Sequence, residues 1–430
     1  MDTAQTDSLA SGAGKSSAPV LAAERTMGSR MFAAFRHRNY RLYFTGQLIS
    51  QIGTWMQQVA QGWLMYNLTG SPLALGLVGF MSAIPAWFLS LSVGVIVDRV
   101  PRRNLILITQ TSAMVLAFVL AALVFAGIVQ PWHILVLALL LGIVNIFDVT
   151  ARQAFVTDMV GREDLANAIA MNSALFNLSR ILGPAFAGVT LAVVGPAWCF
   201  LLNGLSFLAV IYGLAIMTGP VFKARIRVLS MWGEIKEGLA YVRQSTLIKT
   251  LVSVVCVSSI FGFTYSTLLP AYARDVLHVD AKGLGFMSTA VGIGALAGAL
   301  VVASIGPNIP KGRVLTVGNI LFPLSLILLA LARSYPLSLL ILVLVGFGFM
   351  IQQAMSNTLV QTSTPDHLRG RVLSVYMLLG FQGMQPLGAI QAGIVAENFG
   401  IPVAIGVGAV ALLIFGFFLL WKVPSLRHTP

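Results

Sequence analysis

Long apolar stretches separated by short polar turns run through most of this chain of 430 residues. Several uncharged stretches, such as 105–133 and 402–421, reach the roughly 18 residues that a membrane-spanning helix requires. The apolar windows predict twelve such helices, at residues 42–68, 73–97, 105–128, 134–155, 166–194, 198–217, 247–271, 283–304, 314–332, 337–361, 373–395 and 402–421. An even number of spans places both termini on one side of the membrane.

The longest polar connection, residues 218–246, divides these helices into two sets of six. Apolar residues from Trp232 to Val242 recur there at three- and four-residue steps, which predicts an amphipathic helix on the membrane surface. The halves also repeat weakly, since DLANA at 164–168 and HLRGR at 367–371 each open a predicted helix, and repeated halves are typical of transporters.

We therefore expect an all-α membrane protein with twelve transmembrane helices in two pseudo-symmetric six-helix bundles. The expected organisation is a disordered cytosolic tail (1–40), the first bundle (41–217), a cytosolic linker with the amphipathic helix (218–246), the second bundle (247–422) and a cytosolic tail (423–430).

The composition excludes a water-soluble fold. Hydrophobic residues make up 57% of the chain and the mean hydropathy is +0.87, well above the values of soluble domains. The net charge of +13 does not indicate a nucleic-acid partner, because the basic residues lie in short segments between the spans. Of 27 Lys and Arg residues, 22 fall on the side of the termini. The positive-inside rule then predicts a multi-pass protein of the bacterial inner (cytoplasmic) membrane with both termini cytosolic.

Little else in the sequence indicates bound groups. Residues 1–40 lack the apolar core of a cleavable signal peptide. Cys199 and Cys256 lie within apolar segments and are expected to pack, so we predict no metal and no cofactor. The glycines of residues 283–298 follow no strand, which favours close helix packing over a dinucleotide-binding loop.

A charged turn between the second and third spans carries the clearest motif. Gly94, Asp98, Arg99, Arg102 and Arg103 follow the pattern Gly, three residues, Asp, Arg, two residues, Arg, Arg. This resembles the signature of the major facilitator superfamily, except that Pro101 stands where the usual pattern has Gly. The resemblance implies a cytosolic gate that holds the two bundles together in one state and releases them in the other. The alternative is a topology anchor, although Asp98 contributes nothing to positive-inside orientation.

Two further ionisable positions lie within spans, where charges are costly and usually functional. Asp148 and Arg152 are four residues apart on one helix and can pair. The resemblance implies a gate role for them, with proton transfer by Asp148 as the alternative. Arg180 lies near the middle of the fifth span and needs a partner, which is either Asp148 or an anionic group of a substrate.

Polar side chains predict the substrate path. Five of them recur at steps of four and three residues on the first span and share one face that lipid cannot satisfy, although bonding between helices is an alternative role. They are Gln47, Gln51, Thr54, Gln58 and Gln61. The second half offers Tyr265, Gln353, Asn357, Gln382 and Gln385. In the superfamily, spans one, four, seven and ten line the central path.

A closer resemblance is to the bacterial drug and siderophore exporter branch, similar to enterobactin exporters. It rests on residues 35–71, on ARQAFV (151–156) and REDLANA (162–168), and on PDHLRGRV (365–372). The resemblance implies a monomeric secondary transporter in the lipid bilayer that exports an amphipathic small molecule by alternating access, coupled to protons. Uptake, flipping of a lysophospholipid-like lipid and a non-transporting sensor remain as alternatives. The five His residues lie at loops or span ends, so we expect no enzyme.

Overall fold

The computed structural model describes residues 33–161, 163–218, 231–306 and 309–423. Its first bundle comprises η1 (Ala33–Arg36), α2 (Arg38–Thr69), α3 (Pro72–Arg99), α4 (Arg102–Phe125), α5 (Pro131–Val160), α6 (Leu165–Val193) and α7 (Pro196–Ala215). The connecting helix is α8 (Met231–Gln244). The second bundle comprises α9 (Thr246–Val257), η2 (Ser258–Gly262), α10 (Thr264–Ala271), η3 (Tyr272–Val276), α11 (Ala281–Ser304), α12 (Lys311–Leu331), α13 (Tyr335–Ser363), α14 (Asp366–Met377), η4 (Leu378–Gln382), α15 (Gly383–Phe399) and α16 (Ile401–Lys422).

The predicted fold class is confirmed. Ten helical segments of the described residues are long and apolar enough to cross a membrane. The more polar α2 and the helical segment of residues 366–399 are also long enough to do so, which agrees with the twelve expected spans. We call the side on which α2 begins the terminal face, and the side on which it ends the opposite face.

Helix ends follow local sequence signals. Pro stands in the first turn of α3, α5, α7, α13 and α16, where its missing N–H leaves no bond unmade. The Ser71 side chain caps α3 by accepting from the N–H of Ala74 at 3.3 Å. Two spans differ from the sequence prediction: residues 246–276 and 366–399 are interrupted by the π-helical turns η2, η3 and η4, which hydrophobic periodicity does not reveal.

The structure also revises the start of the first bundle. Residues 33–40, part of the predicted disordered tail, are helical and packed: the N–H of Ala34 donates to Asn167 Oδ1 at 2.9 Å, and Tyr40 is fully buried. The rest of that tail, 1–32, lies outside the described residues, as do most of the linker (219–230) and residues 424–430 of the C-terminal tail. The predicted amphipathic helix coincides with α8, which packs on α14 through an ion pair between Glu237 and Arg371.

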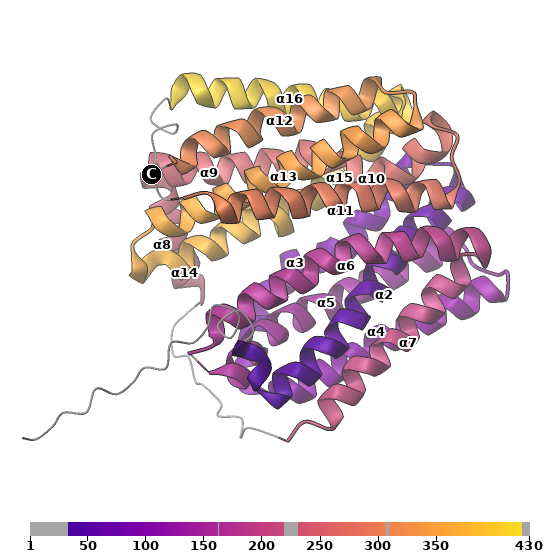
Figure 1. The fold of residues 1–430 in the computed structure, drawn as a ribbon, viewed down its shortest axis with the longest axis horizontal. Coiled ribbons are helices and arrows are strands. Elements are labelled where there is room, and N and C mark those ends of the chain that lie inside the picture. Colours follow the sequence, from indigo (N-terminus) through magenta and orange to yellow (C-terminus); the bar gives the residue numbers. More distant parts are fainter. Residues whose placement is uncertain (1–32, 162, 219–230, 307–308, 424–430) are drawn as a thin grey trace, which may run out of the picture.

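The hydrophobic cores show how the two bundles meet. One core joins both bundles near the opposite face, with Leu75 and Leu191 from the first bundle and Leu284 and Ala396 from the second. At the terminal face, each bundle has a separate core. The bundles accordingly lie close together on one side and diverge toward the side of α8 and α14 (Figure 1).

Close backbone contacts make this junction possible. A Cβ on Gly188 of α6 would lie only 2.9 Å from the Cα of Gly285 on α11, and a Cβ on Gly393 of α15 only 2.8 Å from the Cα of Leu73 on α3. Glycine at these positions lets the helices pack backbone to backbone. The glycines of α11 therefore serve helix packing, as the sequence predicts.

Candidate functional site

The charged turn between α3 and α4 assembles at the terminal face. Arg102, in the first turn of α4, donates from Nη1 to both carboxylate oxygens of Asp158 on α5, at 2.8 and 2.7 Å. Its Nη2 lies 3.4 Å from Asp98 Oδ1 at the end of α3. Because one nitrogen of its guanidinium contacts Asp158 and the other contacts Asp98, Arg102 links the ends of three helices. Asp158 is a partner that the sequence motif does not include.

The other motif residues contact the same bundle or solvent. Arg103 Nη2 donates to the carbonyl oxygen of Ala215 at 2.9 Å, at the C-terminal end of α7, where a cation is favourable. Arg99 is exposed and Gly94 is half-buried within α3. These contacts hold the first bundle together in the conformation described.

A second polar cluster lies deeper, among α2, α4 and α5. Asp148 Oδ2 lies 2.7 Å from Arg152 Nε, which is the predicted pair. Asp148 Oδ1 accepts from Thr109 Oγ1 and Gln110 Nε2, both at 2.9 Å. Asp148 is only 3% exposed, so these bonds supply the compensation that a buried carboxylate needs.

Arg152 links this cluster to the first span. Its Nη1 donates to Gln47 Oε1 at 2.7 Å, whereas Gln47 Nε2 is buried without a hydrogen-bond partner among the described residues. Thr109 and Gln110 are partners that sequence reasoning missed, because nothing in a single helical pattern shows which polar residues of α4 face α5.

The remaining polar positions of α2 occupy different environments. Gln51 and Thr54 are half-buried, Gln58 is exposed and Gln61 is buried. The neighbouring Gln57 faces away from this stripe: its Oε1 accepts from Asn203 Nδ2 of α7 at 2.6 Å inside the first bundle. Some α2 amides therefore bond neighbouring helices, while Gln58 is exposed.

In the second bundle, too, some polar side chains are buried and others are partly exposed. Gln353, Asn357 and Gln385 are half-buried, and the Gln382 side chain lies outside the described residues. Tyr265 is only 1% exposed and packs edge-on against Phe322. Gln352, which the sequence analysis passed over, donates from Nε2 to Ser258 Oγ at 2.9 Å and to Asn319 Oδ1 at 2.8 Å.

Polar contacts also join the bundles at the opposite face, and sequence reasoning missed them. Glu397 of α15 accepts at Oε2 from Ser71 Oγ at 2.8 Å and from the N–H of Leu73 at 3.2 Å, at the N-terminus of α3. The Tyr66 hydroxyl of α2 donates to Asp275. We call these contacts the opposite-face latch.

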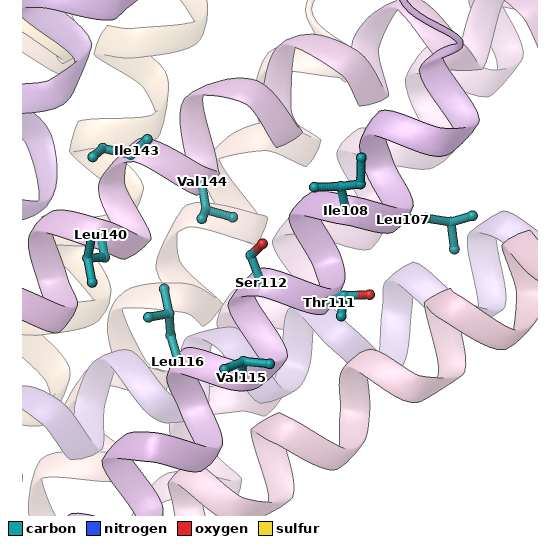
Figure 2. Close-up of a pocket in the computed structure, with 9 residues that line it drawn as sticks. All are labelled: Leu107, Ile108, Thr111, Ser112, Val115, Leu116, Leu140, Ile143 and Val144. Carbon is teal, nitrogen blue, oxygen red and sulfur yellow. The ribbon is translucent and has the colours of Figure 1, made fainter.

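A groove of about 610 Å³ between α4 and α5 is a poor candidate for the path. Figure 2 shows its lining from residues 107–116 and 140–144, which is aliphatic apart from Thr111 and Ser112. Ile108 and Val115 are among the exposed hydrophobic residues of this surface. At membrane depth, such a surface suits lipid chains.

The fold, the charged turn and the polar α2 face together define a membrane transporter of the major facilitator superfamily. The chain belongs to the family described as "Transmembrane secretion effector", whose model matches residues 29–429.

Curated relatives agree with this assignment. The chain is 25% identical over 366 residues to the staphyloferrin A transporter of Staphylococcus aureus, covering 84% of this chain and 90% of that protein. It is 28% identical over 393 residues to the multidrug efflux pump Tap of Mycolicibacterium fortuitum, covering 89% and 94%. Among solved structures, the nucleoside transporter NupG shares the fold, with a TM-score of 0.74, 13% identity and coverage of 89% and 99%.

Proposed function

We propose that this protein is a monomeric secondary active transporter that exports an amphipathic small molecule across the bacterial inner membrane and catalyses no covalent reaction. The observation that carries the mechanism is the asymmetry of the two faces. Near the opposite face the bundles share one hydrophobic core, whereas at the terminal face each bundle has its own. A rocking motion that exchanges these arrangements is alternating access.

The charge distribution orients this mechanism. The sequence assigns 22 of the 27 basic residues to the side of the termini, so the positive-inside rule assigns the terminal face to the cytosol. The conformation described then opens inward, and substrate enters from the cytosol. Export fits the names of curated relatives, which include the efflux pump Tap and a macrolide efflux protein from Streptococcus pyogenes.

The charged turn is proposed to act as the cytosolic gate. In the inward-open state, Arg102 is held by Asp98 and Asp158 within one bundle. When the cytosolic ends approach, the Asp98 carboxylate becomes available to the N-terminal end of a helix in the second bundle, where an anion is favourable. The gate is thus one of two sets of contacts that alternate.

Proton coupling is assigned to Asp148. It is the only acid of the described residues buried within a span and held among three helices, since Glu397 is exposed at the opposite face. Protonation of Asp148 would replace its pairing with Arg152 by a neutral contact, and Arg152 would then be free to change the bond that it already donates to Gln47. The cluster therefore converts a proton into a changed contact between α2 and α5.

The test is transport in everted membrane vesicles, with dyes, antibiotics and iron chelators as substrates. Acidifying the vesicle lumen should drive accumulation of exported compounds, and Asp148→Asn should abolish the proton-driven part. Asp366→Asn, which changes an acid whose side chain is 89% exposed, is the matched control. Loss of substrate from the lumen on acidification would indicate uptake. Unchanged proton-driven transport by Asp148→Asn would remove its coupling role.

A further inference from the structure

Arg180 is a cation deep in the membrane at the junction of the two bundles. At about 1.5 Å per residue, it lies roughly 22 Å along α6 from Leu165, near the middle of the bilayer core. Its Cζ lies 6.0 Å from the ring centroid of Trp55 on α2 and 5.9 Å from that of Phe349 on α13. One ring belongs to each bundle, so the guanidinium is placed between their faces.

The described residues provide no carboxylate for this charge. No acid among them lies within the 4.0 Å of an ion pair with Arg180, and Asp148, the candidate from the sequence, is occupied by Arg152, Thr109 and Gln110. Arginine does not deprotonate in proteins, so its charge persists here. The two aromatic rings stabilise a cation through their faces but satisfy none of its N–H donors.

Backbone contacts between α6 and α11 include Arg180 and extend toward the opposite face. A Cβ on Gly292 of α11 would lie 3.1 Å from the carbonyl oxygen of Arg180, and about two turns further along α6 Gly188 meets Gly285. The Arg180 side chain itself is half-buried. It therefore lies at the inner limit of the region where the bundles diverge toward the terminal face.

Hydrogen-bonding groups flank the aromatic ring. Gln51 and Gln58 stand four residues before and three residues after Trp55, so all three share a face of α2. Gln58 is exposed and Gln51 half-buried. The same surface therefore offers a cation, an aromatic plane and amides.

We propose that Arg180, Trp55 and Phe349 form a binding site for the anionic group of a flat, apolar substrate. The guanidinium edge binds a carboxylate or sulfonate in bidentate fashion, while the substrate ring packs against Trp55 and Phe349. The bound anion supplies the counter-charge that the described residues do not. This inference rests on the proposed function and specifies its substrate class as anionic.

The test compares three probes with one ring system and different charges: 2-naphthoate, 2-naphthalenemethanol and 2-naphthylmethylamine. Each is titrated against the purified protein in detergent, and the shift in Tm gives the affinity. We expect 2-naphthoate to bind at least tenfold more tightly than the other two. Arg180→Gln should remove this preference, a loss of ten- to a hundredfold for the anion alone, and Arg180→Lys should retain part of it because the charge remains.

A second variant keeps the test valid if Arg180→Gln does not fold. Phe349→Leu retains the cation and should weaken all three probes by a similar factor, because it removes only ring contact. Equal affinities of the wild type for the three probes, failure of 2-naphthoate to bind, or an anion preference that survives Arg180→Gln would each overturn the site. Vesicle export of neutral or cationic compounds with no anion preference would leave the proposed function intact and refute only this inference. Binding of 2-naphthoate that depends on Arg180, together with no transport of any compound, would support the site and refute the proposed function.

Discussion

Glu397→Ala should shift the protein toward the state that is open at the opposite face. The carboxylate belongs to the second bundle but accepts from Ser71 Oγ at 2.8 Å and from the Leu73 N–H at 3.2 Å, at the N-terminus of α3 in the first bundle. Both bonds exist only while the bundles touch. Removing the carboxylate therefore destabilises the described state, which we propose is inward-open, and leaves the other state unaffected.

The magnitude follows from the exposure of this contact. Hydrogen bonds to charged groups contribute about 1.5–3 kcal/mol when buried, and an anion at a helix N-terminus about 0.3–1 kcal/mol. Glu397 is exposed, so solvent reduces these contributions to a total of about 1 kcal/mol. This corresponds to a roughly fivefold change in the ratio of the two states.

The assay measures the population of the state that is open at the opposite face. Ala389 is 5% exposed, and its Cβ would lie 3.1 Å from a Cβ on Gly79 of α3, so a thiol introduced by Ala389→Cys is reachable only when the bundles separate. In a background with both native cysteines replaced by alanine, intact cells are labelled with a membrane-impermeant maleimide. The labelling rate is proportional to the open population. We expect it to rise about fivefold with Glu397→Ala.

The neighbouring residue provides the control. Asn398 donates from Nδ2 to the carbonyl oxygen of Ile394 at 2.8 Å within α15 and makes no hydrogen bond to the described residues of the first bundle, so Asn398→Ala should leave the labelling rate unchanged. Ser71→Ala removes one of the two bonds and should give a smaller increase. A labelling rate that is the same in Glu397→Ala and wild type would refute the latch.

Two further predictions concern packing within and between the bundles. Gly188→Val should block closure of the opposite face and reduce transport at least tenfold, because its Cβ would meet the Gly285 Cα at 2.9 Å and the Lys282 carbonyl oxygen at 3.1 Å, both backbone atoms that cannot yield. Vesicle transport measures the loss, and Gly233→Val on α8 is the control, since an added Cβ there meets no described atom within 4 Å. Asn203→Ala should lower stability by about 1 kcal/mol, since it leaves Gln57 without its buried 2.6 Å bond, and thermal unfolding in detergent measures the loss.

The sequence predicted the helices because the bilayer imposes a length and an apolar composition on every span. It also predicted the pair of Asp148 and Arg152, which four residues place on one helix face. Local rules of this kind need no knowledge of the tertiary structure.

Contacts between helices were not predictable in the same way. A repeating pattern of polar residues on α2 does not reveal that Gln57, one position from the stripe, faces Asn203. Nor does the motif identify Asp158, which lies 56 residues from Arg102. The latch depends on the relative position of two bundles, so Glu397 and Ser71, 326 residues apart, carry no shared local signal.

Helix α3 carries the opposite-face latch at one end and the proposed cytosolic gate at the other. A substitution at the gate should therefore change the labelling rate in the direction opposite to Glu397→Ala. Its N-terminus is held by Glu397 in the described state, whereas Asp98 at its other end is proposed to hold the bundles together in the outward-open state. Asp98→Asn should therefore disfavour the outward-open state and slow labelling of the Ala389→Cys thiol. Because the two acids lie at opposite ends of a helix of 28 residues, their effects should add in the double variant with Glu397→Ala, giving a rate between those of the single variants. Faster labelling with Asp98→Asn alone would mean that the charged turn stabilises the same state as the opposite-face latch. The two sets of contacts would then not form in alternate states.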